Sequence, residues 1–471
     1  MRDWSGQRVV VIGAARQGLA LTRYLESHGA RVTLTDRRSY EDLRAARQAL
    51  SDLSVEWVLG DHPASLLQDA DLLCPSGGVP LNLPLLTEAK RRGIPLSNDS
   101  QIFLEAAPCR VVGITGSAGK TTTTSLAGRI AEKSFSLPDK SSPYSGLWVG
   151  GNIGNPLISD LDRMHPGDLV VMELSSFQLE LMTCSPQVAA VLNVTPNHLD
   201  RHGTMAAYIA AKARILAFQT PEDVAVLGFG DPVARSFQEN TRAKIIFFGL
   251  EEPASGHMAV YLRGDEIVLR DDRREEALLS RREVNLPGEH NLLNVLAACA
   301  LAYAANLPVE TMRAGVTGFS GLPHRLEFIR SWGGADWYND SIATAPERAM
   351  AAINSFERPI VLLAGGRDKD LPWEEFARLV IKQVDHLILF GEAAEKIVRS
   401  LDGISLNGYG DERRPYTIDR FDRLHQAVIA ASKIVEKDDI VLLSPGGTSF
   451  DEFRDFEERG ESFKKWVQEL P

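Results

Sequence analysis

Cysteine is scarce in this sequence, and no two cysteines form a C-x-x-C pair. Cys74, Cys109, Cys184 and Cys299 are scattered along the 471 residues. Zinc sites and redox motifs need closely spaced cysteines, and disulfide frameworks are typical of short secreted chains. The spacing argues against all three, and it predicts reduced thiols that are buried as small apolar side chains.

Long apolar runs are missing as well. No stretch approaches the roughly 18 to 20 apolar residues that a membrane-spanning helix needs. The first residues, Met1 to Ser5, lead into a strand pattern without the apolar segment of a secretory signal. We therefore expect a soluble, cytoplasmic chain with no membrane partner.

Basic residues are fewer than acidic residues in this sequence. The chain has 51 lysines and arginines against 63 aspartates and glutamates, so its formal net charge is -12. An acidic surface disfavours nucleic acids and anionic membranes as partners, although a local group of cations can still bind an anionic small molecule. The sequence also shows no coiled-coil heptads and no internal repeats, so we expect a monomer.

What the sequence does contain is short apolar strands that end in glycine. Residues 7–12, 18–28 and 31–35 read as strand, helix and strand, the unit of a parallel sheet buried on both faces. Similar strands begin at 110 and 359, a short strand is expected at 94–96, and residues 243–285 suggest a small antiparallel excursion. These starts predict an α/β chain of three domains with mostly parallel sheets, divided near residues 108 and 322 into 1–108, 109–322 and 323–471.

The strongest local signal is the glycine-rich turn GITGSAGKT at 113–121, between a strand and a helix. Glycines let backbone N–H groups crowd around phosphate oxygens, and a helix N-terminus attracts the anion. Lys120 would neutralise the β- and γ-phosphates, and the Thr121 hydroxyl can bind Mg²⁺. Ile114 occupies the first glycine position of the standard motif, so this is a variant loop. It predicts an ATP or GTP site.

Phosphoryl transfer also needs polar metal ligands. Glu173 ends an apolar strand, where a carboxylate is costly unless it meets a cation. His198 follows another strand in a loop, and taken singly it is more typical of an ordinary loop histidine. Beside the phosphate loop, these residues predict a Mg²⁺ and phosphate site.

The first block carries a glycine-rich turn of its own. Residues 13–18 read G-x-A-x-x-G and are followed by Asp36 at the end of the second strand. This pattern is also a dinucleotide fingerprint, so a dinucleotide-dependent oxidoreductase is a rival interpretation. Ala15 replaces the middle glycine, however, and a dinucleotide-dependent oxidoreductase would not explain the second glycine-rich loop at Lys120.

Taken in order, the motifs resemble those of the Mur ligases over nearly the whole chain. The resemblance rests on residues 113–121, 151–154, 173–178, 193–200, Lys212, 288–291, 322–325, 339–341, 365–369 and 443–445. Within the family, ELSSFQLE and the tail SPGGTSFDEFRDFEERG look most like members that add glutamate to UDP-N-acetylmuramoyl-L-alanine. The implied reaction is ATP-driven addition of D-glutamate through an acyl phosphate, in cytoplasmic synthesis of peptidoglycan precursors.

The resemblance implies a Rossmann-like UDP-substrate-binding domain (1–108), a central P-loop ATPase domain (109–322) and a C-terminal Rossmann-like amino-acid-binding domain (323–471). It also assigns residues to roles. It implies a catalytic set of Lys120, Glu173, His198 and Lys212, and Mg²⁺ held by Thr121, Glu173, His198 and Lys212, the last of which is carbamylated by CO₂ in the family. It implies ATP binding by Gly116, Ser117, Ala118, Gly119, Lys120, Thr121, Thr122, Asn294, Arg325 and Asp340. The UDP-substrate would bind at Gly13, Ala15, Arg16, Gln17, Asp36, Arg38, Ser76, Gly78 and Asn152. The amino acid would bind at Thr344, Lys369, Ser449, Phe450 and Phe456.

Without the family resemblance, Lys212 in the run AAKAR is typical of an exposed helix lysine. The family motif N-D-S-K-A-T reads NDSIAT at 339–344, so Ile342 replaces a lysine near the reacting groups. Losing that cation should weaken charge stabilisation unless Arg348 or Arg367 compensates.

Several alternatives therefore stay open. One is a Mur-type ligase for another amino acid, such as L-glutamate, or for another step. A second is a folate-polyglutamating ligase, which the UDP-type first domain disfavours. A third is a non-catalytic switch that binds nucleotide without turning it over, for which Ile342 is the only support.

Overall fold

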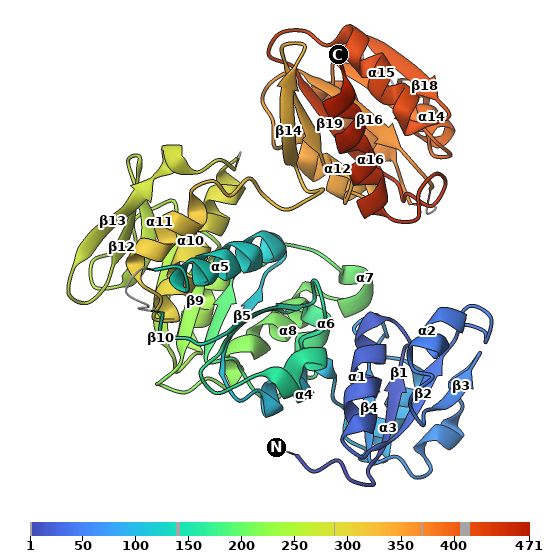
Figure 1. Cartoon of the computed structure of the whole chain (residues 1–471), viewed down its shortest axis with the longest axis vertical. Coiled ribbons are helices and arrows are strands. Elements are labelled where there is room, and N and C mark those ends of the chain that lie inside the picture. The colour runs from blue at the N-terminus through green and yellow to red at the C-terminus, as the bar shows by residue number, and fades with distance from the viewer. Residues whose placement is uncertain (1, 138–141, 287, 369–370, 406–414) are drawn as a thin grey trace. The chain divides into compact units, whose positions relative to one another are not determined.

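The computed structural model describes residues 2–137, 142–286, 288–368, 371–405 and 415–471 (Figure 1). It forms two compact units, Met1–Asn285 with Glu289–Phe319, and Leu286–Gly288 with Ser320–Pro471. Three mostly parallel sheets confirm the predicted α/β fold class. Every helix in the described part of the chain is too short or too polar to cross a bilayer.

The first sheet has the order β3-β2-β1-β4, with all neighbours parallel. Its strands are β1 (Arg8–Ile12), β2 (Arg31–Asp36), β3 (Glu56–Leu59) and β4 (Leu72–Pro75), and its helices are α1 (Arg16–Ser27), α2 (Arg44–Ala49), α3 (Pro84–Arg91) and α4 (Asp99–Ala106). The prediction of a strand at 94–96 is wrong. Only an isolated bridge joins Leu96 to Leu73, because Pro95 has no N–H to extend a ladder.

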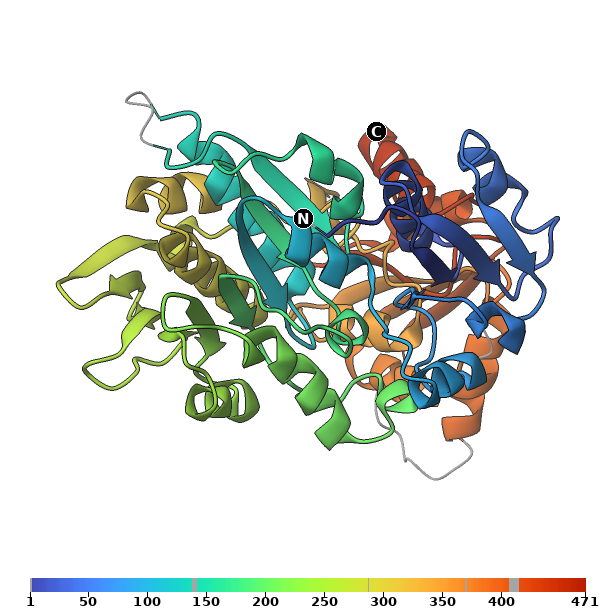
Figure 2. The same cartoon turned by 90° about the horizontal axis from the view of Figure 1, so that it is seen from below.

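The second sheet has nine strands in the order β13-β12-β11-β10-β9-β8-β5-β7-β6. They are β5 (Arg110–Thr115), β6 (Leu147–Gly151), β7 (Leu169–Glu173), β8 (Val188–Val191), β9 (Val224–Gly228), β10 (Lys244–Gly249), β11 (Met258–Arg263), β12 (Glu266–Arg270) and β13 (Glu275–Ser280). The helices are α5 (Lys120–Ser134), α6 (Ser176–Leu179), α7 (Leu199–His202), α8 (Met205–Ala217), α9 (Pro232–Ser236), α10 (Glu289–Ala304) and α11 (Val309–Val316). β5 lies between β8 and β7 and is buried from Val111 to Thr115. The helix α5 packs on α10 and α11 (Figures 1 and 2).

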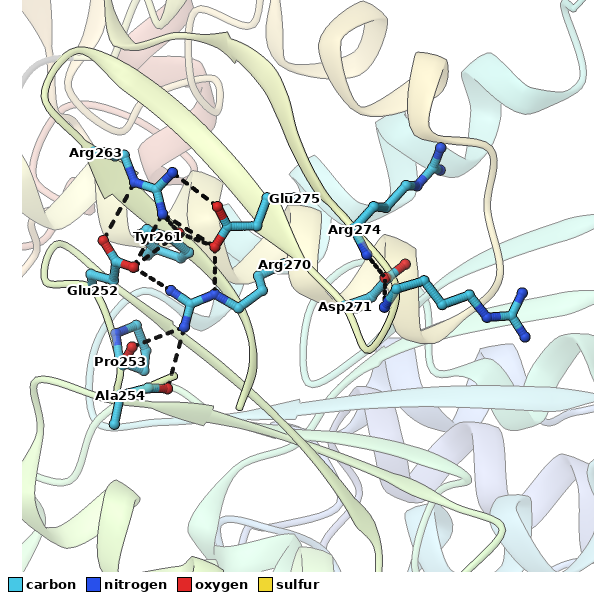
Figure 3. Close-up of polar contacts among 10 residues, drawn as sticks. Glu252, Pro253, Ala254, Tyr261, Arg263, Arg270, Asp271, Arg274 and Glu275 are labelled. Atoms are coloured by element: carbon cyan, nitrogen blue, oxygen red, sulfur yellow. Dashed lines mark hydrogen bonds and ion pairs between the residues drawn. The ribbon is translucent and has the colours of Figure 1, made fainter. Parts of the chain in front are cut away.

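The predicted antiparallel excursion extends this sheet rather than forming a separate one. β11 continues the parallel order, and β12 and β13 pair antiparallel. Figure 3 shows Arg270 between Glu252 and Glu275, with nitrogen–oxygen distances of 2.5 and 2.8 Å. The Arg270 side chain is only 9% exposed and also donates to the Pro253 carbonyl. These pairings offset the cost of burying the guanidinium, so the cluster has a structural role.

The third sheet has the order β14-β15-β19-β16-β17-β18, parallel except for the β14–β15 hairpin. The strands are β14 (Glu327–Trp332), β15 (Ala335–Asn339), β16 (Ile360–Gly365), β17 (His386–Phe390), β18 (Thr417–Phe421) and β19 (Ile440–Gly446). The helices are α12 (Pro346–Ile353), α13 (Glu374–Gln383), α14 (Ala394–Ser405), α15 (Leu424–Ile434) and α16 (Phe456–Glu469). β19 and β16 are buried throughout, so polar residues that follow them are brought to one edge.

Candidate active site

The loop at 116–119 joins the buried strand β5 to the start of α5 and allows no side chain at its glycines. Gly119 has φ +82°, and a Cβ there would lie 2.2 Å from Asn294 Oδ1. A Cβ at Gly116 would lie 2.9 Å from the Leu192 Cβ. The close packing explains the glycine spacing. It also places Asn294, a predicted nucleotide contact, directly behind the loop, where it is buried.

Lys120 bends back over this loop. Its Nζ donates to the Gly116 carbonyl at 2.9 Å and to the Ser117 carbonyl at 3.3 Å. The ammonium group is therefore held beside the N-terminus of α5, where the helix dipole also favours negative charge. A cation, a helix N-terminus and a glycine-rich turn together make an anion site suited to the phosphates of a nucleotide.

A second loop, which follows β8, supports the first. The Asn193 side chain accepts from the Ala118 N–H at 2.9 Å and donates to the Ala118 carbonyl at 3.2 Å. The Ser117 hydroxyl lies 2.9 Å from both the Thr195 carbonyl and the Tyr208 hydroxyl. Asn193 was not among the predicted site residues, although its place directly after a buried strand is the signal that could have identified it.

Glu173 ends β7 and is 2% exposed. Its Oε1 accepts a hydrogen bond from the Asn152 side chain at 3.0 Å, whereas Oε2 is buried and has no hydrogen-bond partner among the described residues. A buried carboxylate oxygen without a donor is costly, so this oxygen suits a cation. Asn152, predicted with the UDP-substrate group, lies against Glu173 at the central sheet.

Of the residues predicted to hold Mg²⁺, the Glu173 carboxylate and the Thr121 hydroxyl offer the oxygen ligands that this ion prefers. Thr121 lies in the first turn of α5, and His198 is an exposed loop residue with φ +53° whose ring lies 5.1 Å from Phe177. No three acidic, histidine or cysteine side chains cluster as metal ligands in the described residues. Mg²⁺ is commonly held by one or two carboxylates together with substrate phosphates, which such a sparse set allows.

Lys212 is buried on α8, so the interpretation as an exposed helix lysine is wrong. It is 1% exposed, its Nζ lies 3.4 Å from the Thr115 hydroxyl, and it sits 4.8 Å above the Tyr208 ring. Burial, together with the charge of Lys120, lowers the pKa of Lys212 to about 6. At neutral pH the amine is therefore mostly uncharged and nucleophilic.

A Glu173→Gln variant separates function from stability at this carboxylate. The amide keeps the shape and removes a buried charge whose Oε2 has no donor, so we expect an unchanged or raised melting temperature and a loss of Mg²⁺-dependent turnover of about 10²-fold or more. Glu222→Gln, at an exposed loop position, is the control. Thermal melting and a Mg²⁺ titration of activity give the two readouts. Full activity with normal Mg²⁺ dependence would remove Glu173 from the metal site.

The predicted UDP-substrate residues of the first sheet meet at the ends of β1, β2 and β4. Asp36 accepts from the Ala14 N–H at 2.7 Å and from the Arg38 guanidinium at 2.9 and 3.1 Å. Burial opposes its ionisation, but these hydrogen bonds hold the pKa of Asp36 well below its usual range. Both of its oxygens are engaged, which disfavours the ribose contact of a dinucleotide enzyme.

The rest of this group closes the same turn. Ser76 donates to the Gly13 carbonyl at 3.1 Å. Ala15 caps α1, Arg16 and Gln17 start it, and the Gly78 carbonyl accepts from Arg201 at 3.2 Å. These residues form one cluster at the carboxyl ends of the strands, where open parallel sheets bind ligands.

The predicted residues of the C-terminal unit gather at the ends of β15 and β19. Asp340 accepts from the Ser444 hydroxyl at 2.8 Å and from the Leu326 N–H at 3.2 Å. Its burial raises the pKa of Asp340 to about 7, although Ser444 and the nearby charge of Arg325 oppose that shift.

The predicted amino-acid residues approach from three segments of the same unit. Ser449 is buried, Thr344 is half-buried, and Phe456 begins α16. The Phe450 side chain is 63% exposed. Lys369 lies outside the described residues.

Comparisons with known proteins agree over the whole length. Three family profiles match in order: "Mur ligase MurD-like, N-terminal domain" (7–98), "Mur ligase middle domain" (114–302) and "Mur ligase, glutamate ligase domain" (324–447). The chain is 41% identical to a UDP-N-acetylmuramoylalanine–D-glutamate ligase of Symbiobacterium thermophilum, over 98% of each chain. It is 39% identical to the ligase of that name from Pelotomaculum thermopropionicum, over 100% of this chain and 99% of the relative.

Solved structures support the fold. The UDP-N-acetylmuramate–alanine ligase of Thermotoga maritima matches with a TM-score of 0.55 and 18% identity, over 98% of this chain and 99% of that one. A pseudomurein peptide ligase type C of Methanothermus fervidus gives a TM-score of 0.54 at 18% identity, over 99% and 100%.

Proposed function

The chain belongs to the Mur ligase family, and we propose that it joins D-glutamate to UDP-N-acetylmuramoyl-L-alanine at the expense of ATP. It is an ADP-forming, amide-bond-forming ligase. Its place is the cytoplasmic synthesis of peptidoglycan precursors, on which cell shape and division depend. The domains proposed for these tasks are 1–108 for the UDP-substrate, 109–322 for ATP and 323–471 for the amino acid.

One observation carries the catalytic part of the proposal. The ends of β5 and β7 bring together the Lys120 phosphate loop, the buried amine of Lys212 and Glu173, whose Oε2 has no partner in the described part of the chain. A dinucleotide-dependent oxidoreductase has no use for a phosphate loop with a metal-binding carboxylate, whereas phosphoryl transfer needs both. The choice of D-glutamate is supported by the relatives, which carry the name UDP-N-acetylmuramoylalanine–D-glutamate ligase.

The reaction has two steps. An alanyl carboxylate oxygen attacks the γ-phosphorus of ATP, the bond to the β-phosphate oxygen breaks, and ADP leaves. The glutamate amine then attacks the carbonyl carbon of the acyl phosphate, loses a proton and displaces inorganic phosphate. In this chain Lys120 and the backbone around it would hold the β- and γ-phosphates, so positioning and charge neutralisation supply most of the rate.

Mg²⁺ would be held by Thr121, Glu173, His198 and the carbamylated Lys212. When bound, it neutralises phosphate charge. Carbamylation is part of the proposal, and the burial of Lys212 supports it because only the neutral amine attacks CO₂. The amine nitrogen forms an N–C bond to CO₂ as one C–O π bond opens, and the nitrogen then releases one proton. This converts a neutral buried amine into an anionic carbamate that could help to hold Mg²⁺.

Substrate-dependent phosphate release tests this function. The purified chain with ATP, Mg²⁺ and UDP-N-acetylmuramoyl-L-alanine is supplied in turn with D-glutamate, L-glutamate and other amino acids. We expect release with D-glutamate only. Release with another amino acid would keep the mechanism and replace the substrate.

A nucleotide-binding switch is the second candidate, because Ile342 replaces a family lysine. It predicts ATP binding without phosphate release for any amino acid. Retention of the half-buried Lys120 beside the buried Glu173 and Lys212 favours the ligase.

Arg348 is the cation that compensates for Ile342 in this account. Its guanidinium donates to the Ile342 carbonyl at 3.5 Å, and its positive charge opposes the rise that burial causes in the pKa of the nearby Asp340. Arg367, the other candidate, faces Glu392 at 3.7 Å. We expect Arg348→Gln to reduce kcat about 10-fold or more, with Arg367→Gln and the exposed Lys382→Gln closer to wild type. Equal effects of all three substitutions on kcat would remove Arg348 from this role.

A further inference from the structure

Arg459 is a fully buried arginine on α16 that no predicted role includes. The residue is 0% exposed. Its Nε donates to the Ser341 hydroxyl at 2.9 Å, its Nη2 to the Ser341 carbonyl at 2.9 Å, and both Nη atoms to the Gly447 carbonyl at 3.2 Å. One guanidinium thus joins three chain segments within the C-terminal unit.

These hydrogen bonds hold the positively charged guanidinium in the protein interior, where an ion is unfavourable. The acceptors are two carbonyls and one hydroxyl, all of them neutral. Burial lowers the pKa of Arg459 to about 10, although the charge of Asp451 opposes the shift, so the group is still protonated at neutral pH. Burying a charge without a hydrogen-bonded counter-ion is costly, and an apolar side chain would fill the space at lower cost. The arginine therefore needs another reason to be there.

The three segments are those that carry the predicted amino-acid residues. Ser341 precedes Thr344, Gly447 precedes Ser449, and Phe456 lies one turn before Arg459 on α16. The Ser341 hydroxyl also donates to the Phe456 carbonyl at 2.8 Å. The Gly446 N–H donates to the Ala343 carbonyl at 2.8 Å, which joins the first two segments directly.

A fourth segment packs against the same group. A Cβ at Gly366 would lie 2.8 Å from Arg459 Nη1 and 2.3 Å from the Thr448 carbonyl oxygen. Gly366 has φ +90°, so glycine is required both for the conformation and for the close approach. The guanidinium is thus enclosed by the turns at the ends of β16 and β19.

We propose that Arg459 is the positioning residue of the amino-acid pocket, which sets the relative placement of Thr344, Ser449 and Phe456 and thereby the affinity for the incoming amino acid. This rests on the function proposed above. Arg459 acts through the Ser341 and Gly447 backbone and does not itself touch the reacting atoms. A planar fork with three nitrogens suits this task because it reaches Ser341 and Gly447 at fixed angles, whereas a lysine ammonium is a single flexible point.

The test compares Arg459→Lys and Arg459→Met with Lys465→Met, an exposed lysine on the same helix. The KM values for ATP, UDP-N-acetylmuramoyl-L-alanine and D-glutamate are measured separately for the full chain. We expect the KM for D-glutamate to rise about 10-fold or more in both Arg459 variants, because displacement of a binding group by about 1 Å can cost up to 10²-fold. The other two KM values should stay within about twofold, and the Lys465 control should match wild type.

A merely structural role would give a different pattern. It predicts that all three KM values rise together, or that only the melting temperature falls while the KM for D-glutamate is unchanged, and either result would overturn the proposal. If the Arg459 variants do not fold, Ser341→Ala removes one acceptor and leaves the arginine in place. It should raise the KM for D-glutamate by a smaller factor, and an unchanged KM would count against the proposal.

Acyl-phosphate formation in the absence of amino acid distinguishes the role proposed for Arg459 from the proposed ligase function. We expect the Arg459 variants to transfer the γ-phosphate to UDP-N-acetylmuramoyl-L-alanine at the wild-type rate when D-glutamate is omitted. Failure of the wild-type chain in that step would refute the ligase itself. Failure of the variants alone would refute the assignment of Arg459 to the amino-acid pocket.

Discussion

Replacing Lys120 with methionine is expected to lower kcat/KM for ATP by about 10³-fold, the upper range for loss of one charge-stabilising donor. Lys120 Nζ lies over the phosphate loop, 2.9 Å from the Gly116 carbonyl. Methionine keeps most of the side-chain volume but leaves the charge that develops during γ-phosphoryl transfer without its cation. Initial rates at varied ATP concentration measure the effect.

Lys133→Met is the matched control, because Lys133 lies in the last turn of the same helix. It removes one positive charge from α5 without touching the loop, and we expect near-wild-type rates. A Lys120→Met enzyme that is folded and within threefold of wild type would show that the loop does not bind the reacting phosphates.

Replacing Lys212 with methionine should cost about 10²- to 10³-fold in kcat, and the same substitution should raise stability at neutral pH. Burial lowers the folded-state pKa of Lys212 to about 6, below the ordinary lysine value of 10.5. Between those two values the unfolded chain binds the extra proton, so the Lys212 contribution to stability rises with pH through that window. Lys212→Met removes both the free-energy cost of burying the amine and the dependence of stability on pH between those two values. Thermal melting at pH 6.5 and pH 9 measures them, with the exposed Lys244→Met as control.

Carbamylation gives the Lys212 prediction a second readout. The neutral amine is the form that reacts with CO₂, so the activity of the wild-type chain should fall as pH drops through about 6 and should rise with added bicarbonate. A carbamate carbon signal from ¹³C-bicarbonate should appear in wild type and be absent in Lys212→Met. Activity that is indifferent to CO₂ removal, without such a signal, would argue against the modification.

The phosphate loop was the part of the site most accessible from sequence. Its glycines, Lys120 and Thr121 are adjacent in the chain, and each is required by a local conformation or by a phosphate. The sequence also pointed to Glu173 as a candidate metal ligand, because a carboxylate at the end of an apolar strand is costly without a cation. The α/β fold class followed from strands with glycines at their ends.

Residues that act through long-range contacts were harder to predict. Lys212 lies in a helix whose pattern looks exposed, and its burial comes from packing against Tyr208 and Thr115. Asn193 and Arg459 act on loops 75 and 118 residues away in sequence. No periodicity marks such residues, since their partners are set by how separate strands meet.

Transfer of an ¹⁸O atom from substrate to phosphate tests whether the chain forms an acyl phosphate and joins D-glutamate to it. UDP-N-acetylmuramoyl-L-alanine labelled in its alanyl carboxylate is incubated with ATP, Mg²⁺ and the wild-type chain, with D-glutamate or L-glutamate. The account predicts one labelled oxygen in the released phosphate and one new amide per ADP, with D-glutamate only. Amide formation with unlabelled phosphate would contradict the acyl-phosphate mechanism, and ATP binding without amide from any amino acid would contradict the ligase.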